Sequence, residues 1–285
     1  PGSVLGNSFG DCFRDHQRTC RCRRRRPSGM RRRGAALVYG ANTDVGKTAV
    51  SGGLVQAALR RRGAAAYLKP VQTGVRNDDE GDAAAIRRYA AAVKRGRLVA
   101  CETLHSWLLA ASPHVAAALE ERGVPTDSEL AAGVGAWLER HEASELDAIS
   151  LILETAGGVL SPTPQGGLQA DAFAPLHQRF GLKSVLVGDA KLGGVSVTLC
   201  ALECLERRGL HVDAVVFVGG DAALGNAAYV RERCGGNRVV CELEPLPHAA
   251  SHVRPRAGGG IDCDPAQAAD AAAPRRLAGV RGAEL

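Results

Sequence analysis

The stretch LVYGANTDVGKTAVSGGL, residues 37–54, decides the fold of this chain. It reads as a buried strand, a loop bounded by glycines and a helix, and the loop ends in Gly46, Lys47 and Thr48. That ending is typical of a phosphate-binding loop, whose backbone N–H groups and helix N-terminus attract phosphate. Five residues separate Gly40 from Gly46, where the common motif has four. The stretch predicts a nucleotide site at the first strand–helix junction.

Short β-rich runs alternate with longer helical stretches over most of the chain. Most of the runs are continuously apolar, as expected for parallel strands that are covered on both faces. The repeated strand–helix–strand pattern predicts an α/β, P-loop NTPase-type three-layer fold with a mainly parallel sheet flanked by helices. The predicted strands are 35–40, 64–70, 147–154, 183–189, 213–220 and 238–245, and the predicted helices are 47–62, 81–95, 128–143 and 195–208.

The composition divides the chain into an Arg-rich leader at 1–33, a P-loop domain at 34–248 and a low-complexity tail or linker at 249–285. The net charge is +6, but the leader alone holds ten Arg against two acidic residues, so the remainder is close to neutral. No nucleic-acid partner is therefore expected. No apolar stretch approaches the roughly 18 residues of a membrane span, so no membrane is expected either.

The leader is rich in Arg and poor in acidic residues, a pattern typical of an organelle transit peptide. A nuclear signal, an RNA-binding arm and mistranslated upstream sequence remain alternatives. The chain begins with Pro rather than Met, which indicates a fragment or a processed protein.

Two carboxylates and a second lysine are candidates for the chemistry of the nucleotide site. Glu154 ends the apolar run LILE, where a Mg²⁺ ligand that complements the Thr48 hydroxyl is expected. Asp82 is a third candidate ligand, although an acidic residue there is also typical of a helix cap. Lys47 would neutralise the β- and γ-phosphates. Lys69, in YLKPVQTG, is either an ammonium near the γ-phosphate or a surface lysine.

Two further loops open helices. In SPH, residues 112–114, Ser112 is the expected cap and Pro113 the first-turn residue. The stretch DAKLGGVSVTL, residues 189–199, opens a helix after glycines, and its free N–H groups could hold a second anion such as a carboxylate.

These motifs together resemble the dethiobiotin synthetase family. The family pattern has the five-residue loop spacing, seen here as GANTDVGKT, and Y-K-P-V-x-[ST]-G, seen here as YLKPVQTG with one inserted Leu68. SPH, ETAGG and KLGG follow in the family order between about 35 and 210. The versions VGDAKLGG and GGVLSPTPQGGLQADAFAP look most like the synthetase half of the bifunctional plant and fungal enzymes, in which a diaminopelargonate aminotransferase follows.

The resemblance implies a biotin-forming cyclo-ligase that uses ATP as co-substrate and Mg²⁺ as cofactor. Carbon dioxide adds to one amine of 7,8-diaminopelargonic acid, ATP phosphorylates the resulting carbamate, and the second amine closes the ring with release of ADP and phosphate. A homodimer, a fused or separate aminotransferase, and a mitochondrial or otherwise cytoplasmic location are also implied.

The resemblance also carries roles over to residues of this chain. Lys47 and Lys69 would be catalytic, and Thr48, Asp82 and Glu154 would bind Mg²⁺. Thr73 would contact the amine or carbamate end of the substrate, and Gly193, Gly194 and Ser196 its distal carboxylate across a dimer interface. The implied ATP contacts are Gly40, Asp44, Val45, Gly46, Lys47, Thr48, Ala49, Glu154, Thr155, Ala156 and Gly157.

The chain departs from the family pattern at a few positions. Asn42 and Asp44 replace Asp and Glu, and Thr155 replaces a glycine, which is expected to crowd the γ-phosphate side slightly. The run VFVGGD lacks the Asn-Asp pair that reads adenine in bacterial members, which leaves residues 245–247 as base-pocket candidates.

Two other functions compete with the ligase. One is a nucleotide switch of the partitioning or septum-positioning ATPase type, whose extra early-loop lysine is missing from ANTDVGK. The other is a related amidoligase, although the glutaminase domain that usually accompanies such enzymes is not evident.

Overall fold

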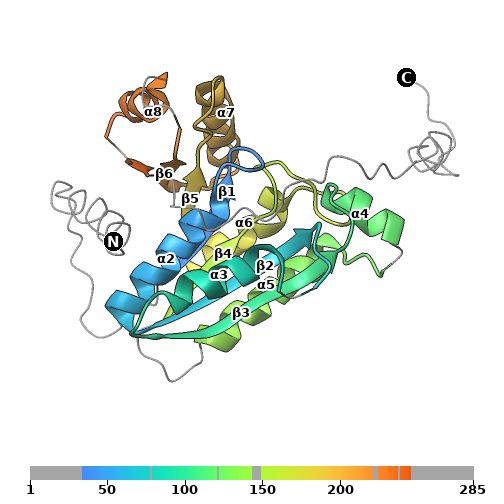
Figure 1. The fold of residues 1–285 in the computed structure, drawn as a ribbon. Helices are drawn as coiled ribbons and strands as arrows, with labels where there is room; N and C mark the ends of the chain where they lie inside the picture. Colours follow the sequence, from blue (N-terminus) through green and yellow to red (C-terminus); the bar gives the residue numbers. More distant parts are fainter. Residues whose placement is uncertain are drawn as a thin grey trace, which may run out of the picture. The chain divides into compact units, whose positions relative to one another are not determined.

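The computed structural model describes residues 34–77, 79–120, 122–142, 149–220, 224–236 and 238–244. Its strands form a seven-stranded sheet in the order β3-β2-β4-β1-β5-β6-β7, and at least one helix lies between each strand and the next along the chain (Figure 1). The strands are β1 (Gly34–Gly40), β2 (Ala64–Thr73), β3 (Arg97–Trp107), β4 (Ile149–Glu154), β5 (Lys183–Val187), β6 (Val212–Val218) and β7 (Val239–Leu243). The helices are α2 (Lys47–Arg62), α3 (Gly81–Ala91), α4 (Pro113–Glu120), α5 (Asp127–Glu142), α6 (Gln169–Phe180), α7 (Gly194–Glu206) and α8 (Asn226–Arg233).

Every neighbouring pair of strands in this sheet is parallel. β1 lies at the centre, with Val38 paired to Glu154 of β4 on one side and Gly40 paired to Val187 of β5 on the other. The strand order reverses at the centre of the sheet. β2 and β3 lie on the β4 side of β1, whereas β6 and β7 lie on its β5 side. Ligands bind at such a switch point, outside the carboxyl ends of the strands.

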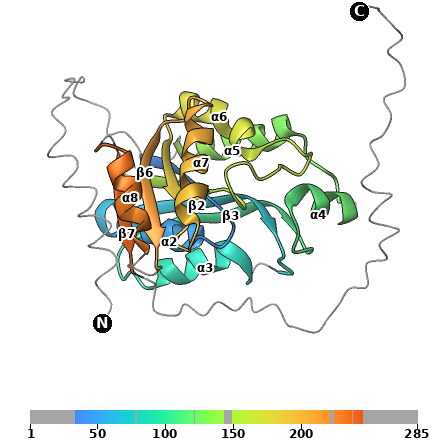
Figure 2. The same cartoon turned by 90° about the horizontal axis from the view of Figure 1, so that it is seen from above.

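Helices cover both faces of the sheet, which makes three layers (Figure 2). On one face, α2 and α3 pack over side chains that include Val38 and Tyr67. On the opposite face, side chains of α4 to α8 pack over a larger cluster that includes Leu37 and Tyr39. The alternation of Leu37, Val38 and Tyr39 between the faces follows from the two-residue period of a strand.

The predicted fold class is confirmed, as are the six predicted strands and four predicted helices, with ends that differ by a few residues. Sequence reasoning missed β3, α6 and α8. β3 is the edge strand and most of its residues are only half-buried, so RLVACETLHSW lacks the apolar run of the inner strands. α6 contains Pro175 and follows many turn residues, but Phe173 and Leu176 bury its apolar face.

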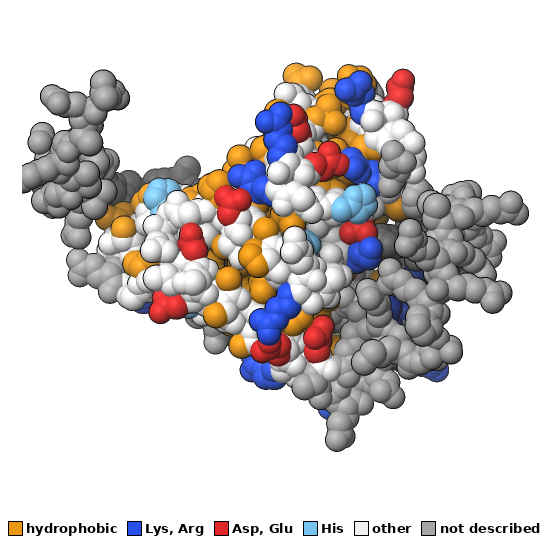
Figure 3. All heavy atoms as spheres, turned by 180° about the vertical axis from the view of Figure 1, so that it is seen from behind, with side chains coloured by type: hydrophobic (Ala, Val, Ile, Leu, Met, Phe, Trp, Pro, Cys, Tyr) orange, Lys and Arg blue, Asp and Glu red, His pale blue; other side chains and the backbone are white. Residues whose placement is uncertain are grey.

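The described residues contain no helix that is long and apolar enough to cross a membrane. Side chains of both charges are interspersed with apolar ones on the face in Figure 3, as expected for a nearly neutral domain. The predicted leader at 1–33, the tail at 249–285 and the base-pocket candidates at 245–247 lie outside the described residues. The domain boundaries stay a prediction.

Candidate active site

The phosphate-binding loop wraps around the stem of Lys47. Lys47 begins α2, its side chain is buried, and its ammonium donates to the backbone oxygen of Asn42 at 3.2 Å. A Cβ atom on Gly40 would lie 2.8 Å from that oxygen and 2.9 Å from Lys47 Cδ, too close for a real side chain. The glycine at position 40 is therefore required by the lysine that folds over it.

Two residues of the loop adopt left-handed backbone angles. Gly46 has a φ of 94°, and a Cβ atom there would lie 2.9 Å from Val218 Cβ at the end of β6. Asp44 has a φ of 56°, and it is the one non-glycine residue with positive φ in the described part of the chain. Such angles turn successive N–H groups to one side, as an anion-binding loop requires. Val45 is buried, and Lys47, Thr48 and Ala49 form the first turn of α2.

Three of the predicted residues converge beside the start of α2. The hydroxyl of Thr48 lies 3.0 Å from Asp82 Oδ1 and 3.0 Å from Glu154 Oε1. Glu154 ends β4 and is fully buried, whereas Asp82 lies in the first turn of α3. Asp82 is held there by its backbone N–H, which donates to Gln72 Oε1 at 3.3 Å. Asp82 thus lies in the first turn of a helix, as predicted, and also beside Thr48; its role as a metal ligand stays a prediction.

Lys69 lies in the same cluster and is not a surface lysine. Its ammonium is buried, 2.6 Å from Asp82 Oδ2 and 3.0 Å from Glu154 Oε1, and it also donates to Thr155 O at 3.0 Å. Burial acts to lower the pKa of Lys69, but the two carboxylates outweigh it and raise that pKa above its ordinary value. Burial acts to raise the pKa of Asp82, but Lys69 outweighs it and the pKa is lowered. Both groups are therefore charged near neutral pH.

The pKa of the second lysine, Lys47, is shifted in the opposite direction. Burial and then the charge of Lys69 lower the pKa of Lys47 to about 8, although the carboxylates of Glu154 and Asp82 act to raise it. Two buried lysines thus stand near the loop, Lys69 with a raised pKa and Lys47 with a lowered one. A bound polyanion such as a triphosphate would favour the charged form of Lys47.

The donor set beside Thr48 suits Mg²⁺. One hydroxyl and two carboxylates supply oxygen ligands, which Mg²⁺ prefers, and Mg²⁺ usually adds water and nucleotide phosphate to a few such ligands. Within the described ranges, no group of three or more His, Cys, Asp and Glu side chains could hold a metal by itself. The residues therefore fit a metal that binds together with a nucleotide rather than a permanent metal cage.

The segment after β4 is anchored to its surroundings by hydrogen bonds. Thr155 donates from its backbone N–H and from its hydroxyl to Val38 O, at 3.0 and 3.3 Å, so its side chain turns back toward β1. The effect of Thr155 on a bound γ-phosphate stays a prediction. Gln169, the first residue of α6, accepts from Ala156 N at 3.0 Å and donates to Ala156 O at 3.1 Å and Pro162 O at 3.2 Å. Gly157 follows with a φ of 64°.

The predicted substrate contacts lie at the end of one strand and after another, and these two strands are not neighbours in the sheet. Thr73 ends β2, whereas Gly193, Gly194 and Ser196 stand at the start of α7, which follows β5. β4 and β1 separate β2 from β5, a distance of roughly 14 Å at about 4.8 Å per strand. The structure thus does not bring Thr73 together with the α7 residues at one point within a single chain.

Asn226 is another residue that sequence reasoning missed. Its buried side-chain amide donates to Asp189 O at 3.1 Å and Lys191 O at 2.9 Å, and so it fixes the loop that leads into α7. Gln169 lies within GGVLSPTPQGGLQADAFAP and Asn226 lies outside the motifs described above, and in neither case does the sequence show that the side-chain amide bonds backbone atoms.

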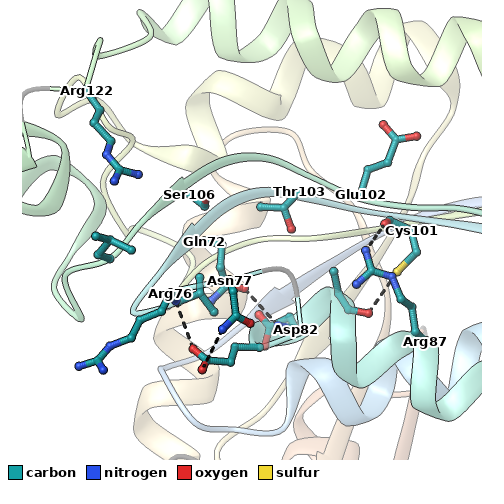
Figure 4. Close-up of a pocket in the computed structure, with 14 residues that line it drawn as sticks. Gln72, Arg76, Asn77, Asp82, Arg87, Cys101, Glu102, Thr103, Ser106 and Arg122 are labelled. Carbon is teal, nitrogen blue, oxygen red and sulfur yellow. Dashed lines mark hydrogen bonds between the residues drawn. The ribbon is translucent and has the colours of Figure 1, made fainter.

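A hollow of about 390 Å³ opens beside Asp82, over the ends of β2 and β3. Figure 4 shows Arg76 and Arg122 toward one end and Arg87 beside Cys101 toward the other. The hollow is also lined by the acidic residues Glu80, Asp82 and Glu102. The lining therefore selects no single charge of ligand, although the hollow gives solvent access to the Asp82 side of the site.

The parallel sheet, the glycine-bounded loop at its switch point and the buried Lys47 define a P-loop nucleotide-binding protein. A family model described as an AAA domain matches residues 35–252. A protein of Paramagnetospirillum magneticum named ATP-dependent dethiobiotin synthetase BioD is 33% identical over 211 residues, which cover 74% of this chain and 88% of that protein. The chain belongs to the dethiobiotin synthetase family.

Longer relatives share the same part of the chain. A protein of Oryza sativa subsp. japonica, named bifunctional dethiobiotin synthetase/7,8-diamino-pelargonic acid aminotransferase, mitochondrial, is 34% identical over 264 residues. A bifunctional dethiobiotin synthetase/adenosylmethionine-8-amino-7-oxononanoate aminotransferase of Emericella nidulans is 40% identical over 215 residues. Each match covers 75% of this chain, but only 31% of the rice protein and 25% of the Emericella protein. The chain thus spans a third or less of these relatives.

Proposed function

We propose that this chain catalyses the ATP-dependent ring closure of 7,8-diaminopelargonic acid to dethiobiotin in biotin formation. One observation carries the proposal: Lys69, Asp82 and Glu154 lie together beside the phosphate-binding loop, near the carboxyl ends of the strands. Family membership, including a relative named an ATP-dependent dethiobiotin synthetase, supports the use of ATP.

In the proposed reaction, the nitrogen of one amine attacks the carbon of CO₂ and loses a proton, which gives a carbamate. A carbamate oxygen then attacks the γ-phosphorus of ATP, and ADP leaves. The second amine attacks the carbamate carbon and loses a proton, the ureido ring closes, and phosphate leaves with the former carbamate oxygen. The carbamate, the γ-phosphate and the phosphorylated intermediate are all anionic, so converging cations are needed more than a strong base.

The residues of the chain divide this work between them. The loop from Gly40 to Thr48 would bind the triphosphate through backbone N–H groups, with the ammonium of Lys47 against the β- and γ-phosphates. The ammonium of Lys69 would give up some of its contacts with Asp82 and Glu154 and would bind the carbamate and the transferred phosphoryl group. Thr73, at the end of the same strand, would hold the amine end of the substrate.

Mg²⁺ is proposed as the cofactor, held by Thr48, Asp82 and Glu154. When bound, it would supply charge stabilisation to the phosphoryl group that is transferred. The burial of Glu154 and Lys69 would keep water away from the phosphorylated carbamate, which water would otherwise hydrolyse.

We also propose that the chain acts as a homodimer in which the start of α7 holds the distal carboxylate of the partner copy's substrate. Apolar side chains are exposed in this region, with Leu192 88% exposed and Val197, Leu224 and Tyr229 also exposed. Exposed apolar patches mark interaction surfaces. Leu192→Asp is expected to shift the protein toward monomer in light scattering and to reduce turnover with it. A Leu192→Asp dimer with normal turnover would contradict this arrangement.

The names of the relatives suggest a location and a partner for this chain, and both are proposals. The rice relative is named mitochondrial, and we propose that residues 1–33 direct this chain to mitochondria. Fusion of these residues to a fluorescent reporter tests this, and a diffuse signal would contradict it. We further propose that a diaminopelargonate aminotransferase, fused or separate, supplies the substrate, as the names of the bifunctional relatives suggest.

The central test is release of ADP from the purified chain with ATP, Mg²⁺, bicarbonate and diaminopelargonate. ADP release that requires both bicarbonate and diaminopelargonate, together with a dethiobiotin mass in the product, is expected. No substrate-dependent ADP release from folded protein would sink the proposal. ADP release without diaminopelargonate would instead favour a nucleotide-switch ATPase.

A further inference from the structure

One buried hydroxyl touches the proposed Mg²⁺ site without being part of it. The hydroxyl of Tyr67 donates to Glu154 Oε2 at 3.0 Å, and both side chains are fully buried. The other oxygen of the same carboxylate, Oε1, lies 3.0 Å from the Thr48 hydroxyl and 3.0 Å from the Lys69 ammonium. The two oxygens of Glu154 therefore face different partners.

The strand geometry explains how Tyr67 reaches the carboxylate. Tyr67 pairs with Ile152 across the β2–β4 ladder, so Glu154 is its diagonal neighbour on the same face of the sheet. Diagonal neighbours are within reach of a long aromatic side chain. Leu68 stands between Tyr67 and Lys69, and successive side chains point to opposite faces, so Tyr67 and Lys69 share the face that carries Glu154. In a Tyr-Lys sequence without Leu68, the tyrosine would point away from it.

We propose that Tyr67 is a positioning residue that holds Glu154 with Oε1 turned toward Thr48 and the phosphate-binding loop. This inference rests on the proposed role of Glu154 as a Mg²⁺ ligand. A carboxylate with one oxygen held by a fixed donor keeps the other in a single direction, as outer partners of metal ligands do. Without the hydroxyl, Oε2 would be buried without its donor, and the carboxylate would turn to share Lys69 or Thr48.

The phenol is suited to this task because its hydroxyl can donate to Oε2, and a carboxylate oxygen accepts. Its ring lies among apolar side chains between the sheet and the helices α2 and α3, which fix its orientation.

The test compares Tyr67→Phe with Tyr39→Phe in the full chain. Tyr39 is a matched control, since it is also a buried strand tyrosine, but its hydroxyl pairs with His177 Nε2 at 3.1 Å on the opposite face of the sheet. The dissociation constant of ADP is measured by calorimetry over a series of Mg²⁺ concentrations. We expect Tyr67→Phe to need roughly 10-fold more Mg²⁺ for half of the Mg²⁺-dependent tightening, with unchanged ADP affinity in its absence. Tyr39→Phe should match the unmodified chain.

Equal Mg²⁺ requirements in the two variants would overturn the inference, as would ADP binding that ignores Mg²⁺ in the unmodified chain. Failure of the proposed function is separate, because it would appear as absent diaminopelargonate-dependent ADP release while the Mg²⁺ comparison still decides the role of Tyr67.

A measurement on the unmodified chain covers the case in which Tyr67→Phe does not fold. The chain has four tyrosines, at 39, 67, 89 and 229, so ring-labelled protein gives a simple NMR spectrum. The Cζ resonance of Tyr67 should shift when Mg²⁺ is added to the ADP complex, whereas that of Tyr39 should not. A Tyr67 resonance that ignores Mg²⁺ would overturn the inference.

Discussion

The ammonium of Lys69 lies 3.0 Å from Oε1 of Glu154, and neither side chain has appreciable contact with solvent. The two residues come from the neighbouring strands β2 and β4, and the register of these strands places them side by side near the carboxyl ends. Ligands of such sheets bind outside these ends. A buried ammonium between two carboxylates is held in place before any ligand arrives. The proposed catalytic cation is thus also a structural one, and its removal should affect both properties.

Lys69→Met is expected to lower the free energy of unfolding by roughly 3–5 kcal/mol, because it leaves Glu154 and Asp82 without their buried counter-charge. It should also abolish turnover while much of the nucleotide binding remains, since Lys47 and the loop are intact. Urea unfolding, ATP titration and the ADP-release assay measure these effects.

Lys183→Met is the control for this change. The Lys183 ammonium is 2.6 Å from Asp213, but the Lys183 side chain is 66% exposed, so its loss should cost less than about 1 kcal/mol. If Lys69→Met lost nucleotide binding and turnover equally, Lys69 would be a nucleotide contact and not a group that acts on the carbamate.

Gly40→Ala is expected to weaken ATP binding by roughly 10- to 100-fold, which corresponds to about 1–3 kcal/mol of overpacking. The new methyl group would press on Asn42 O and Lys47 Cδ and displace the lysine. Gly133→Ala is the control, because its methyl group would lie 3.6 Å from Leu104 Cδ1 and replace glycine inside α5. That variant should keep ATP affinity and gain stability. Unchanged ATP affinity in Gly40→Ala would contradict the loop geometry described above.

The fold was largely predictable, because the inner strands are continuous apolar runs in the sequence. β4 and β5 are buried along nearly their whole length, so LILE and VLV carry a strong signal. β3 carries a weak one, since its place at the sheet edge lets Glu102, Thr103 and His105 remain half-buried. Propensity alone cannot reveal that a polar segment will pair with β2.

The residues of the site that lie in the glycine-bounded loop or carry a charge could be predicted from the sequence. The uncharged side chains that hold them in place could not. Lys47, Thr48 and Glu154 lie at strand ends and helix starts, so their convergence follows from a parallel sheet. Tyr67 contributes one hydrogen bond and Gln169 three, all from buried positions. Both lie in stretches that match the family pattern, but nothing in the sequence shows which atoms their side chains contact. Their identification depends on register and distance.

Gln169→Glu is expected to destabilise the protein by roughly 1–3 kcal/mol and to raise the KM for ATP. The new carboxylate can still accept from Ala156 N but cannot donate to Ala156 O or Pro162 O, so it frees the segment after Glu154. Gln178→Glu changes an exposed glutamine on the same helix and should alter neither property. Equal unfolding midpoints for the two variants would contradict the anchoring role of Gln169.

The free energy of unfolding should fall as the pH is lowered from 7 to 5, with His177 as one cause. Burial lowers the pKa of this imidazole, whose ring nitrogens pair with Tyr39 OH at 3.1 Å and Leu182 O at 3.3 Å. A histidine whose folded pKa lies below its unfolded value of about 6.5 binds a proton more readily in the unfolded chain. Its stabilising contribution is therefore complete above that value and is lost as the pH falls through it.

His177→Gln should remove up to about 1.4 kcal/mol per pH unit from the slope of this decline, the limit for one proton. Urea unfolding at several pH values measures the slope. His114→Gln serves as the control, because His114 is exposed at the start of α4 and should leave the slope unchanged. Identical slopes in the His177→Gln variant and the unmodified chain would show that the folded protein takes up the His177 proton as readily as the unfolded chain does.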